Sequence, residues 1–189
     1  MTRLIIFLLL IGTLTACSVN KSLVNSDKTN FFPFKDQREI KMIYLNSDSY
    51  VKYIYTGEKE IINGKEYYKR LSNYSWNKIE THYFREENGN NYYYDLTSKT
   101  ESLNIPREIK TGYSWKSNDE AWAYEITNTK AKLTTPEKTY RNLVVIKATQ
   151  LQNRDKDKSQ EYFNYYQIGV GHIASLTNGR IMNYKSEAK

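Results

Sequence analysis

The sequence has few of the residues that build reactive sites. It contains one cysteine, Cys17, and two histidines in 189 residues. A single cysteine excludes an internal disulfide framework. Neither His82 nor His172 has a second histidine, a cysteine or paired carboxylates at metal-ligand spacing. We therefore expect no metal and no other cofactor, and we interpret both histidines as partly exposed strand residues.

Long apolar runs are also scarce. The one clear run is Leu4–Ile11, preceded by the basic segment Met1-Thr2-Arg3 and followed by Gly12. A bilayer-spanning helix needs about 20 apolar residues, so this run is too short to span. A basic start followed by a short apolar core is typical of a signal peptide.

The segment ends in Leu14-Thr15-Ala16-Cys17, which resembles the lipobox of bacterial lipoproteins. The resemblance implies diacylglycerol transfer to Cys17, cleavage between Ala16 and Cys17, and usually N-acylation of the new amino terminus. Two or more acyl chains anchor a protein stably in a membrane, whereas one chain binds marginally. The alternative is an ordinary secretory signal with an incidental cysteine. Ser18 after the cysteine implies the outer membrane in a cell with two membranes, and otherwise the outer face of the plasma membrane.

Composition divides the chain into four parts. We expect a removed signal peptide at 1–16, a lipidated cysteine with a flexible polar tether at 17–30, a single domain at 31–185 and a C-terminal tail at 186–189. A coil as long as the tether has an end-to-end distance of about 20 Å. A domain of this size buries about 68–70% of the surface of its unfolded chain, which suffices for one core.

The positive charge is spread along the chain. The formal net charge is +7, and removing 1–16 would take away only Arg3 and leave +6. A nucleic-acid binder would show a clustered basic stripe, so we expect no nucleic-acid partner. The charge suits either a mild attraction to anionic lipid headgroups or envelope polymers, or simply a soluble surface.

Prolines are few, and the residues after 31 alternate with the period of two that is typical of strands. Asn63-Gly64, Asn88-Gly89 and Asn178-Gly179 each lie between such runs and predict tight hairpins. Pro136 indicates a further turn, and the charged stretch 153–160 a protruding loop. No stretch has helical periodicity. The sequence predicts an all-β, antiparallel meander of about nine to eleven strands that closes as a barrel or a sandwich.

Several short pieces resemble a group of uncharacterised, exported, β-rich bacterial lipoproteins. They are Phe32-Pro33-Phe34, the Asn63–Tyr68 hairpin, Gly112–Trp115, Thr135-Pro136 with Tyr140–Leu143, and Tyr165–Ile173, which is close to a YY-x-x-GVG-x-I ending. The resemblance implies a mostly β fold and a place in the cell envelope. It implies no activity and no catalytic residues.

No pattern in the sequence indicates a catalytic or calcium site. Asp155, Asp157, Ser159 and Glu161 alternate like calcium ligands, but an EF-type loop needs Gly at its sixth position and Glu at its twelfth. Those positions hold Gln160 and Tyr166 here. No Gly-x-Ser-x-Gly elbow occurs. We therefore expect no catalytic residues and a protein that is not an enzyme.

Tyrosine and tryptophan are abundant, with 18 and three copies. They suit half-buried strand positions as well as ligand-binding surfaces. The candidates for a ligand-binding groove are Tyr92, Tyr94, Trp115, Trp122, Tyr124, Tyr165 and Tyr166. The sequence favours a membrane-anchored, non-catalytic binding module of the envelope that holds a lipid, glycan or peptide. The alternative is a structural lipoprotein that docks on an envelope protein complex.

Overall fold

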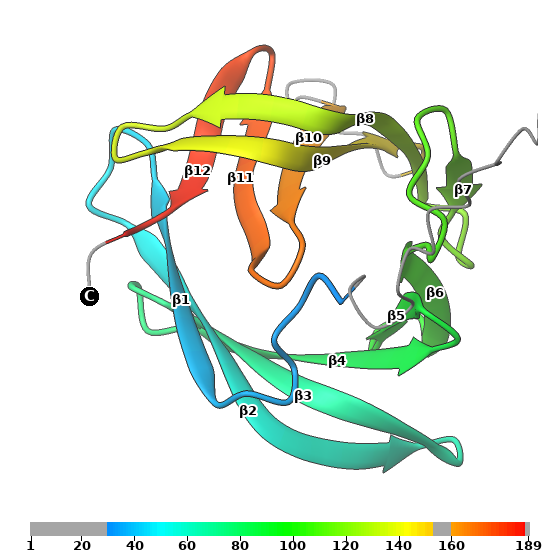
Figure 1. The fold of residues 1–189 in the computed structure, drawn as a ribbon. Coiled ribbons are helices and arrows are strands. Elements are labelled where there is room, and N and C mark those ends of the chain that lie inside the picture. Colours follow the sequence, from blue (N-terminus) through cyan, green and yellow to red (C-terminus); the bar gives the residue numbers. More distant parts are fainter. Residues whose placement is uncertain (1–29, 153–159, 188–189) are drawn as a thin grey trace, which may run out of the picture.

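A computed structural model describes residues 30–152 and 160–187, and it contains twelve strands (Figure 1). They are β1 (Arg38–Tyr44), β2 (Tyr50–Ile62), β3 (Lys65–Tyr74), β4 (Ile79–Glu87), β5 (Asn90–Asp95), β6 (Thr100–Ile105), β7 (Ser114–Lys116), β8 (Trp122–Thr134), β9 (Thr139–Gln150), β10 (Glu161–Gln167), β11 (Gly171–Thr177) and β12 (Arg180–Lys185). The predicted signal peptide, Cys17 and its cleavage site, the tether up to residue 29 and positions 153–159 lie outside the described residues.

All twelve strands form one antiparallel sheet that curls into a nearly closed barrel. Its order is β6-β5-β4-β3-β2-β1-β12-β11-β10-β9-β8-β7, so two six-strand meanders join where β1 pairs with β12. The prediction of an all-β meander is confirmed, and the barrel rather than the sandwich is the form it takes. The strand number exceeds the predicted nine to eleven, and β7, with three residues, is too short to show alternation.

The predicted Asn-Gly hairpins form as expected. Asn63 and Gly64, between β2 and β3, have φ values of 50° and 77°. Positive φ at both central residues is what a type I′ turn requires, and its twist matches that of the flanking strands. Asn88-Gly89 and Asn178-Gly179 have the same signs of φ between β4 and β5 and between β11 and β12.

The two edge strands, β6 and β7, lie beside each other without a backbone ladder. Trp115 Nε1 on β7 donates to the Leu103 carbonyl at 2.8 Å. The Asn118 backbone N–H donates to Ser102 Oγ at 2.9 Å, and the Asn118 side chain reaches the Glu101 carbonyl. Side chains therefore bridge the seam that completes the barrel.

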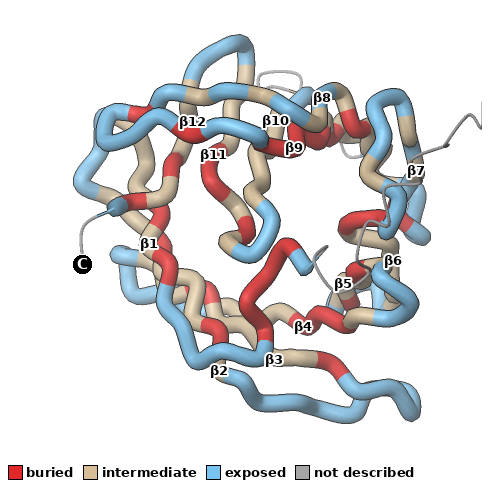
Figure 2. The backbone as a smooth tube through the Cα atoms, in the orientation of Figure 1, coloured by how far each residue is buried: buried red, intermediate tan, exposed pale blue. Residues whose placement is uncertain are grey.

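The first described residues enter the barrel and fill part of its interior. Phe31, Phe32 and Phe34 are only 4%, 6% and 3% exposed, and the segment crosses the inside of the ring of strands (Figures 1 and 2). Phe34 stacks on Tyr68 and Phe84, with ring centroids 5.8 and 5.2 Å away. We call Phe31–Phe34 the plug.

The position of Asn30 defines the two ends of the barrel. Its carbonyl accepts a hydrogen bond at 2.8 Å from Gly169 N–H, in the turn between β10 and β11. Because all neighbouring strands are antiparallel, alternate turns share an end. We call the end with the β10–β11 and β2–β3 turns the proximal end. The end with the β1–β2, β3–β4 and β11–β12 turns is the distal end.

A second apolar cluster lies where the β8–β9 hairpin packs against β11 and β12. Leu143, Ile173 and Ala174 are fully buried there, together with Tyr140 and Tyr184. This cluster fixes the hairpin and therefore one side of the barrel. In the described part of the chain, no helix is long and apolar enough to cross a membrane.

Candidate functional site

A cavity of about 390 Å³ occupies the barrel interior beside the plug. Its aromatic lining is Phe32, Tyr53, Phe84, Tyr93 and Tyr166. Its polar lining is Arg70, His82, Asn104, Asn164, His172, Ser175 and Asn183. These side chains come from the plug and from eight of the twelve strands, so only the folded barrel brings them together.

Strand register shows that the cavity lies on the distal side of the plug. Phe34 contacts Tyr55, Tyr68 and Phe84 on β2, β3 and β4. On the same faces, two residues nearer the distal end of each strand, stand the cavity residues Tyr53, Arg70 and His82. The plug therefore closes the proximal side of the cavity.

Arg70 carries the one full positive charge among the described lining residues. Its guanidinium lies over two rings, with Cζ 4.4 Å from the centroid of Tyr53 and 4.8 Å from that of Phe84. Its Nε is buried and has no hydrogen-bond partner in the protein. Among the described residues, no carboxylate forms an ion pair with Arg70. Two aromatic rings thus contact this side chain, while none of the described carboxylates neutralises its charge.

His172 belongs to a hydrogen-bonded group on β10 and β11. Its Nε2 lies 2.9 Å from Ser175 Oγ, which in turn donates to Asn164 Oδ1 at 2.7 Å. Its ring lies 5.4 Å from that of Tyr166. Burial, and then the nearby charge of Arg70, lower the pKa of His172 to about 4. The imidazole is therefore neutral near pH 7.

His82 lies directly opposite Arg70 in the β3–β4 register. Burial and then Arg70 lower its pKa to about 4 as well. Its Nε2 is buried without a hydrogen-bond partner, since Glu80 Oε2 lies 3.7 Å away. Glu80 itself accepts from Tyr74 at 2.9 Å and pairs with Lys78 at 2.6 Å. This carboxylate is thus already engaged at the distal rim.

The tyrosine hydroxyls of the cavity are protonated at neutral pH. Burial is the main cause that raises the pKa of Tyr53, Tyr93 and Tyr166. The cavity therefore combines one guanidinium with neutral imidazoles, amides and hydroxyls. Such a lining offers surfaces for stacking and groups for hydrogen bonding.

Of the seven predicted aromatic residues, Tyr166 lines this cavity. Tyr124 stacks on Trp115 at 5.3 Å and packs against the main core, and Trp115 bridges the seam. Trp122 contacts Tyr162 with centroids 6.0 Å apart.

The other three predicted aromatics lie away from the cavity. Tyr92 lies under the Arg85 guanidinium at 4.6 Å. Tyr94 packs on Tyr67 in a separate cluster, and Tyr165 belongs to the cluster beneath the β8–β9 hairpin. The structure therefore does not gather the seven into one groove.

Sequence reasoning missed Arg70 and did not connect the two histidines. One feature of the sequence could have identified Arg70: by strand alternation it lies on the same face of β3 as Tyr68, Ser72 and Tyr74. An arginine in a row of inward-facing residues is unusual, since charges are rarely buried unless paired. No local signal places His172 near Arg70, because β11 and β3 are not neighbours.

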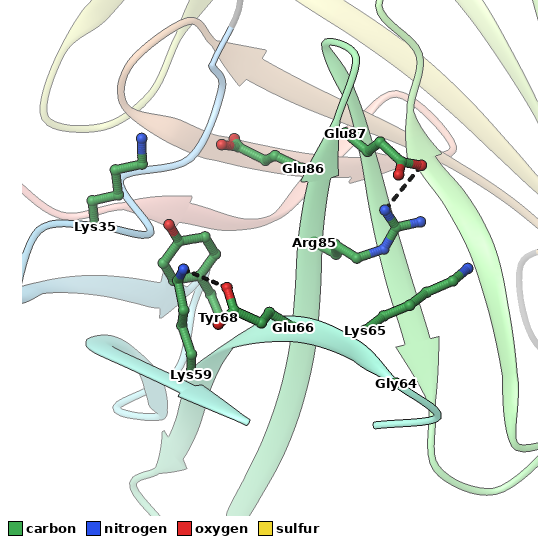
Figure 3. Close-up of a pocket in the computed structure, with 9 residues that line it drawn as sticks. All are labelled: Lys35, Lys59, Gly64, Lys65, Glu66, Tyr68, Arg85, Glu86 and Glu87. Atoms are coloured by element: carbon green, nitrogen blue, oxygen red, sulfur yellow. Dashed lines mark hydrogen bonds and ion pairs between the residues drawn. The ribbon is translucent and has the colours of Figure 1, made fainter. Parts of the chain in front are cut away.

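A second hollow, of about 430 Å³, lies beside the β2–β3 hairpin, with Lys35 and Tyr68 among its lining residues (Figure 3). Most of its cationic side chains form ion pairs: Lys59 with Glu66 at 2.7 Å, Lys65 with Glu101 at 2.9 Å and Arg85 with Glu87 at 3.0 Å. Of the described cations that line the hollow, only Lys35 is outside these pairs, so little positive charge is left for a ligand. The interior cavity, with its unpaired guanidinium, is therefore the stronger candidate.

Comparisons with known proteins add no family to this geometry. Neither protein-family models, nor curated proteins, nor solved structures match the chain. Within the residues that the structure describes, no three histidine, cysteine or acidic side chains are grouped to hold a metal ion.

Proposed function

We propose that this chain is a membrane-anchored, non-catalytic binding protein of the cell envelope that holds a small ligand inside its barrel. The observation that carries the proposal is the interior cavity beside the plug, with aromatic rings and polar side chains on its walls. Its volume of about 390 Å³ falls within the range of about 300–1,000 Å³ that is usual for small-molecule sites.

The lining favours a polar ligand with a flat or ring-shaped body. Rings such as Tyr93 and Tyr166 offer stacking surfaces, and the amides of Asn104, Asn164 and Asn183 offer donors and acceptors. A long acyl chain would leave these polar groups unpaired, which costs free energy. Of the expected ligand classes, a sugar-sized polar molecule therefore fits better than a lipid tail.

The arrangement of the two ends supports a tethered role. The chain enters at the proximal end, and the cavity lies on the distal side of the plug. A hollow beside Val170 of the proximal β10–β11 turn is lined by Arg38 and Lys41 and by two ion pairs, Lys52 with Glu39 at 2.9 Å and Lys185 with Glu187 at 2.6 Å. Arg38 and Lys41, which lie outside these pairs, suit anionic lipid headgroups. With a lipid on Cys17, the cavity would thus face away from the membrane.

Native mass spectrometry of the full-length chain, exported in a bacterial host and released from detergent micelles, tests the proposal. We expect a reproducible added mass that disappears on denaturation. Asn183→Phe should block the cavity and abolish the added mass. Met182→Phe is the matched control, because Met182 is the neighbouring residue and is 36% exposed. A bare mass in the wild type would contradict the proposal and favour docking on an envelope complex instead.

A further inference from the structure

We infer that the ligand in this cavity carries an oxyanion, a carboxylate or a phosphate, and that Arg70 is its anchoring side chain. This inference rests on the proposed function and names the chemical class of the ligand. It starts from the guanidinium packed on the rings of Tyr53 and Phe84.

Charge balance is the first argument. A guanidinium inside a protein is costly unless it is paired. None of the described residues that line the cavity is Asp or Glu, and the rim carboxylate Glu80 is bound to Lys78 and Tyr74. The histidines are neutral near pH 7. The interior therefore keeps a net positive charge that an anionic ligand would neutralise.

The geometry of Arg70 is the second argument. The planar, five-donor fork of arginine binds carboxylate and phosphate oxygens in pairs. The contacts with the two rings use none of its N–H groups, and although the Tyr55 hydroxyl bonds to the guanidinium, the buried Nε has no protein acceptor. An ordinary structural arginine pairs with a carboxylate, as Arg85 does with Glu101 at 2.8 Å. Arg70 has the same fork without that partner.

The opposite wall supplies groups for the rest of the ligand. Figure 1 places β3 and β4 on one side of the barrel and β10 and β11 on the other. Arg70 and His82 belong to the first side, and Asn164, His172 and Ser175 to the second. A molecule bound to Arg70 by its oxyanion would reach these hydrogen-bonding groups with its other end.

The test uses the full-length chain in neutral detergent and two probes, inorganic phosphate and acetate, each against chloride at equal ionic strength. Arg70→Gln removes the fork and its charge. Lys69→Gln is the matched control, since Lys69 is the adjacent residue, points away from the cavity and pairs with Glu58 at 3.4 Å. Thermal unfolding measures binding, and the difference between variants removes the general stabilisation that phosphate gives proteins.

We expect at least one probe to stabilise the wild type and Lys69→Gln in a saturable way. In Arg70→Gln the affinity for that probe should fall by about tenfold or more. The probe that works distinguishes a carboxylate from a phosphate ligand. Because Arg70→Gln could fail to fold, the Arg70 Nε–H resonance of the wild type is followed in the same titrations, and it should shift with the anion but not with chloride.

The experiments distinguish failure of the binding function from failure of the oxyanion assignment. If a ligand mass is found and survives in Arg70→Gln, and neither anion moves the Arg70 resonance, the oxyanion assignment is wrong while the binding function stands. If no ligand mass is found and no anion acts on the wild type, both are wrong.

Discussion

The indole Nε1 of Trp115 donates a hydrogen bond to the carbonyl oxygen of Leu103 at 2.8 Å, across the only gap in the ring of described strands. β6 and β7 share no backbone ladder, so this bond and those of Asn118 join the edges. The Trp115 ring also stacks on Tyr124. One side chain thus connects the seam to the core.

Trp115→Phe should weaken this seam. Phenylalanine keeps a ring against Tyr124 but cannot donate to Leu103, so we expect a loss of about 1–3 kcal/mol in the free energy of unfolding. Amide hydrogen exchange should quicken in β6 and β7 before other strands. Trp76→Phe is the control, because Trp76 is 51% exposed at a turn and its change should cost little. Equal losses in the two variants would contradict the role of the seam bond.

A structural feature can be predicted from the sequence when neighbouring residues alone determine it. The Asn63-Gly64 turn was predictable, because positive φ at two successive residues is a local requirement. The cavity was not, because it needs the register of β3 on β4 and the closure that brings β11 across the barrel. Tyr166 was identified as a candidate, whereas Arg70 was not, since alternation alone does not say which face becomes the interior.

The tyrosine excess has more than one structural use. Tyr53 and Tyr93 line the cavity. Others bind carboxylates: the hydroxyl of Tyr83 donates to Glu60 at 2.7 Å and that of Tyr140 to Glu187 at 2.6 Å. A ring with a polar tip suits both places. For this reason, tyrosine content alone could not separate sheet stabilisation from ligand binding.

Among the carboxylates on the outer face of the sheet, we expect Glu101 to be the one whose replacement lowers the free energy of unfolding most. It accepts bonds from Arg85, Lys65 and Tyr67, and its side chain is only 17% exposed. The Arg85 bonds come first among the causes that lower its pKa to about 2. Glu101→Gln should cost about 2–4 kcal/mol in the free energy of unfolding, because it leaves Arg85 buried with a weaker partner.

Urea unfolding at pH 7 measures that loss. The control is Glu66→Gln, which removes an ion pair with Lys59 at 2.7 Å from a side chain that is 62% exposed. Exposed pairs contribute about 0–1 kcal/mol. If both variants lost the same stability, the cluster around Glu101 would not have the importance that its burial indicates.

The two histidines should make stability depend on pH between about 4 and 6.5. Their pKa in the folded protein is about 4, below the value of about 6.5 in an unfolded chain. As the pH falls from 6.5, the unfolded chain takes up protons that the folded protein does not. Their contribution is fully present above pH 6.5, is lost progressively down to about 4, and is then constant.

Unfolding measured at pH 7 and pH 5 tests this dependence. Glu101 contributes little in that window, because its pKa of about 2 in the folded protein and the value of about 4.3 in an unfolded chain both lie below pH 5. We expect a loss of about 1–3 kcal/mol in the wild type. The double variant His82→Gln and His172→Gln should show a smaller loss. An unchanged slope in the double variant would mean that other groups cause the dependence.

The plug presses against Gly171, and this contact should be sensitive to a single methyl group. A Cβ at Gly171 would lie 3.2 Å from Phe32 Cδ1, and φ at this residue is +99°. A Cβ at Gly64, where φ is +77°, would meet nothing within 4 Å. Both alanine variants carry the backbone strain of positive φ, about 1 kcal/mol or more. Only Gly171→Ala also pushes on the plug.

We therefore expect Gly171→Ala to lower the free energy of unfolding by about 1–3 kcal/mol more than Gly64→Ala. The excess should shrink when Phe32 is replaced by leucine, because the double-mutant cycle then removes the ring that the new methyl group meets. Urea unfolding of the four variants and the wild type provides the measurement. If Gly171→Ala were no worse than Gly64→Ala, the plug would have room to move away from β11, and the proximal wall of the cavity would be less firmly fixed than this contact indicates.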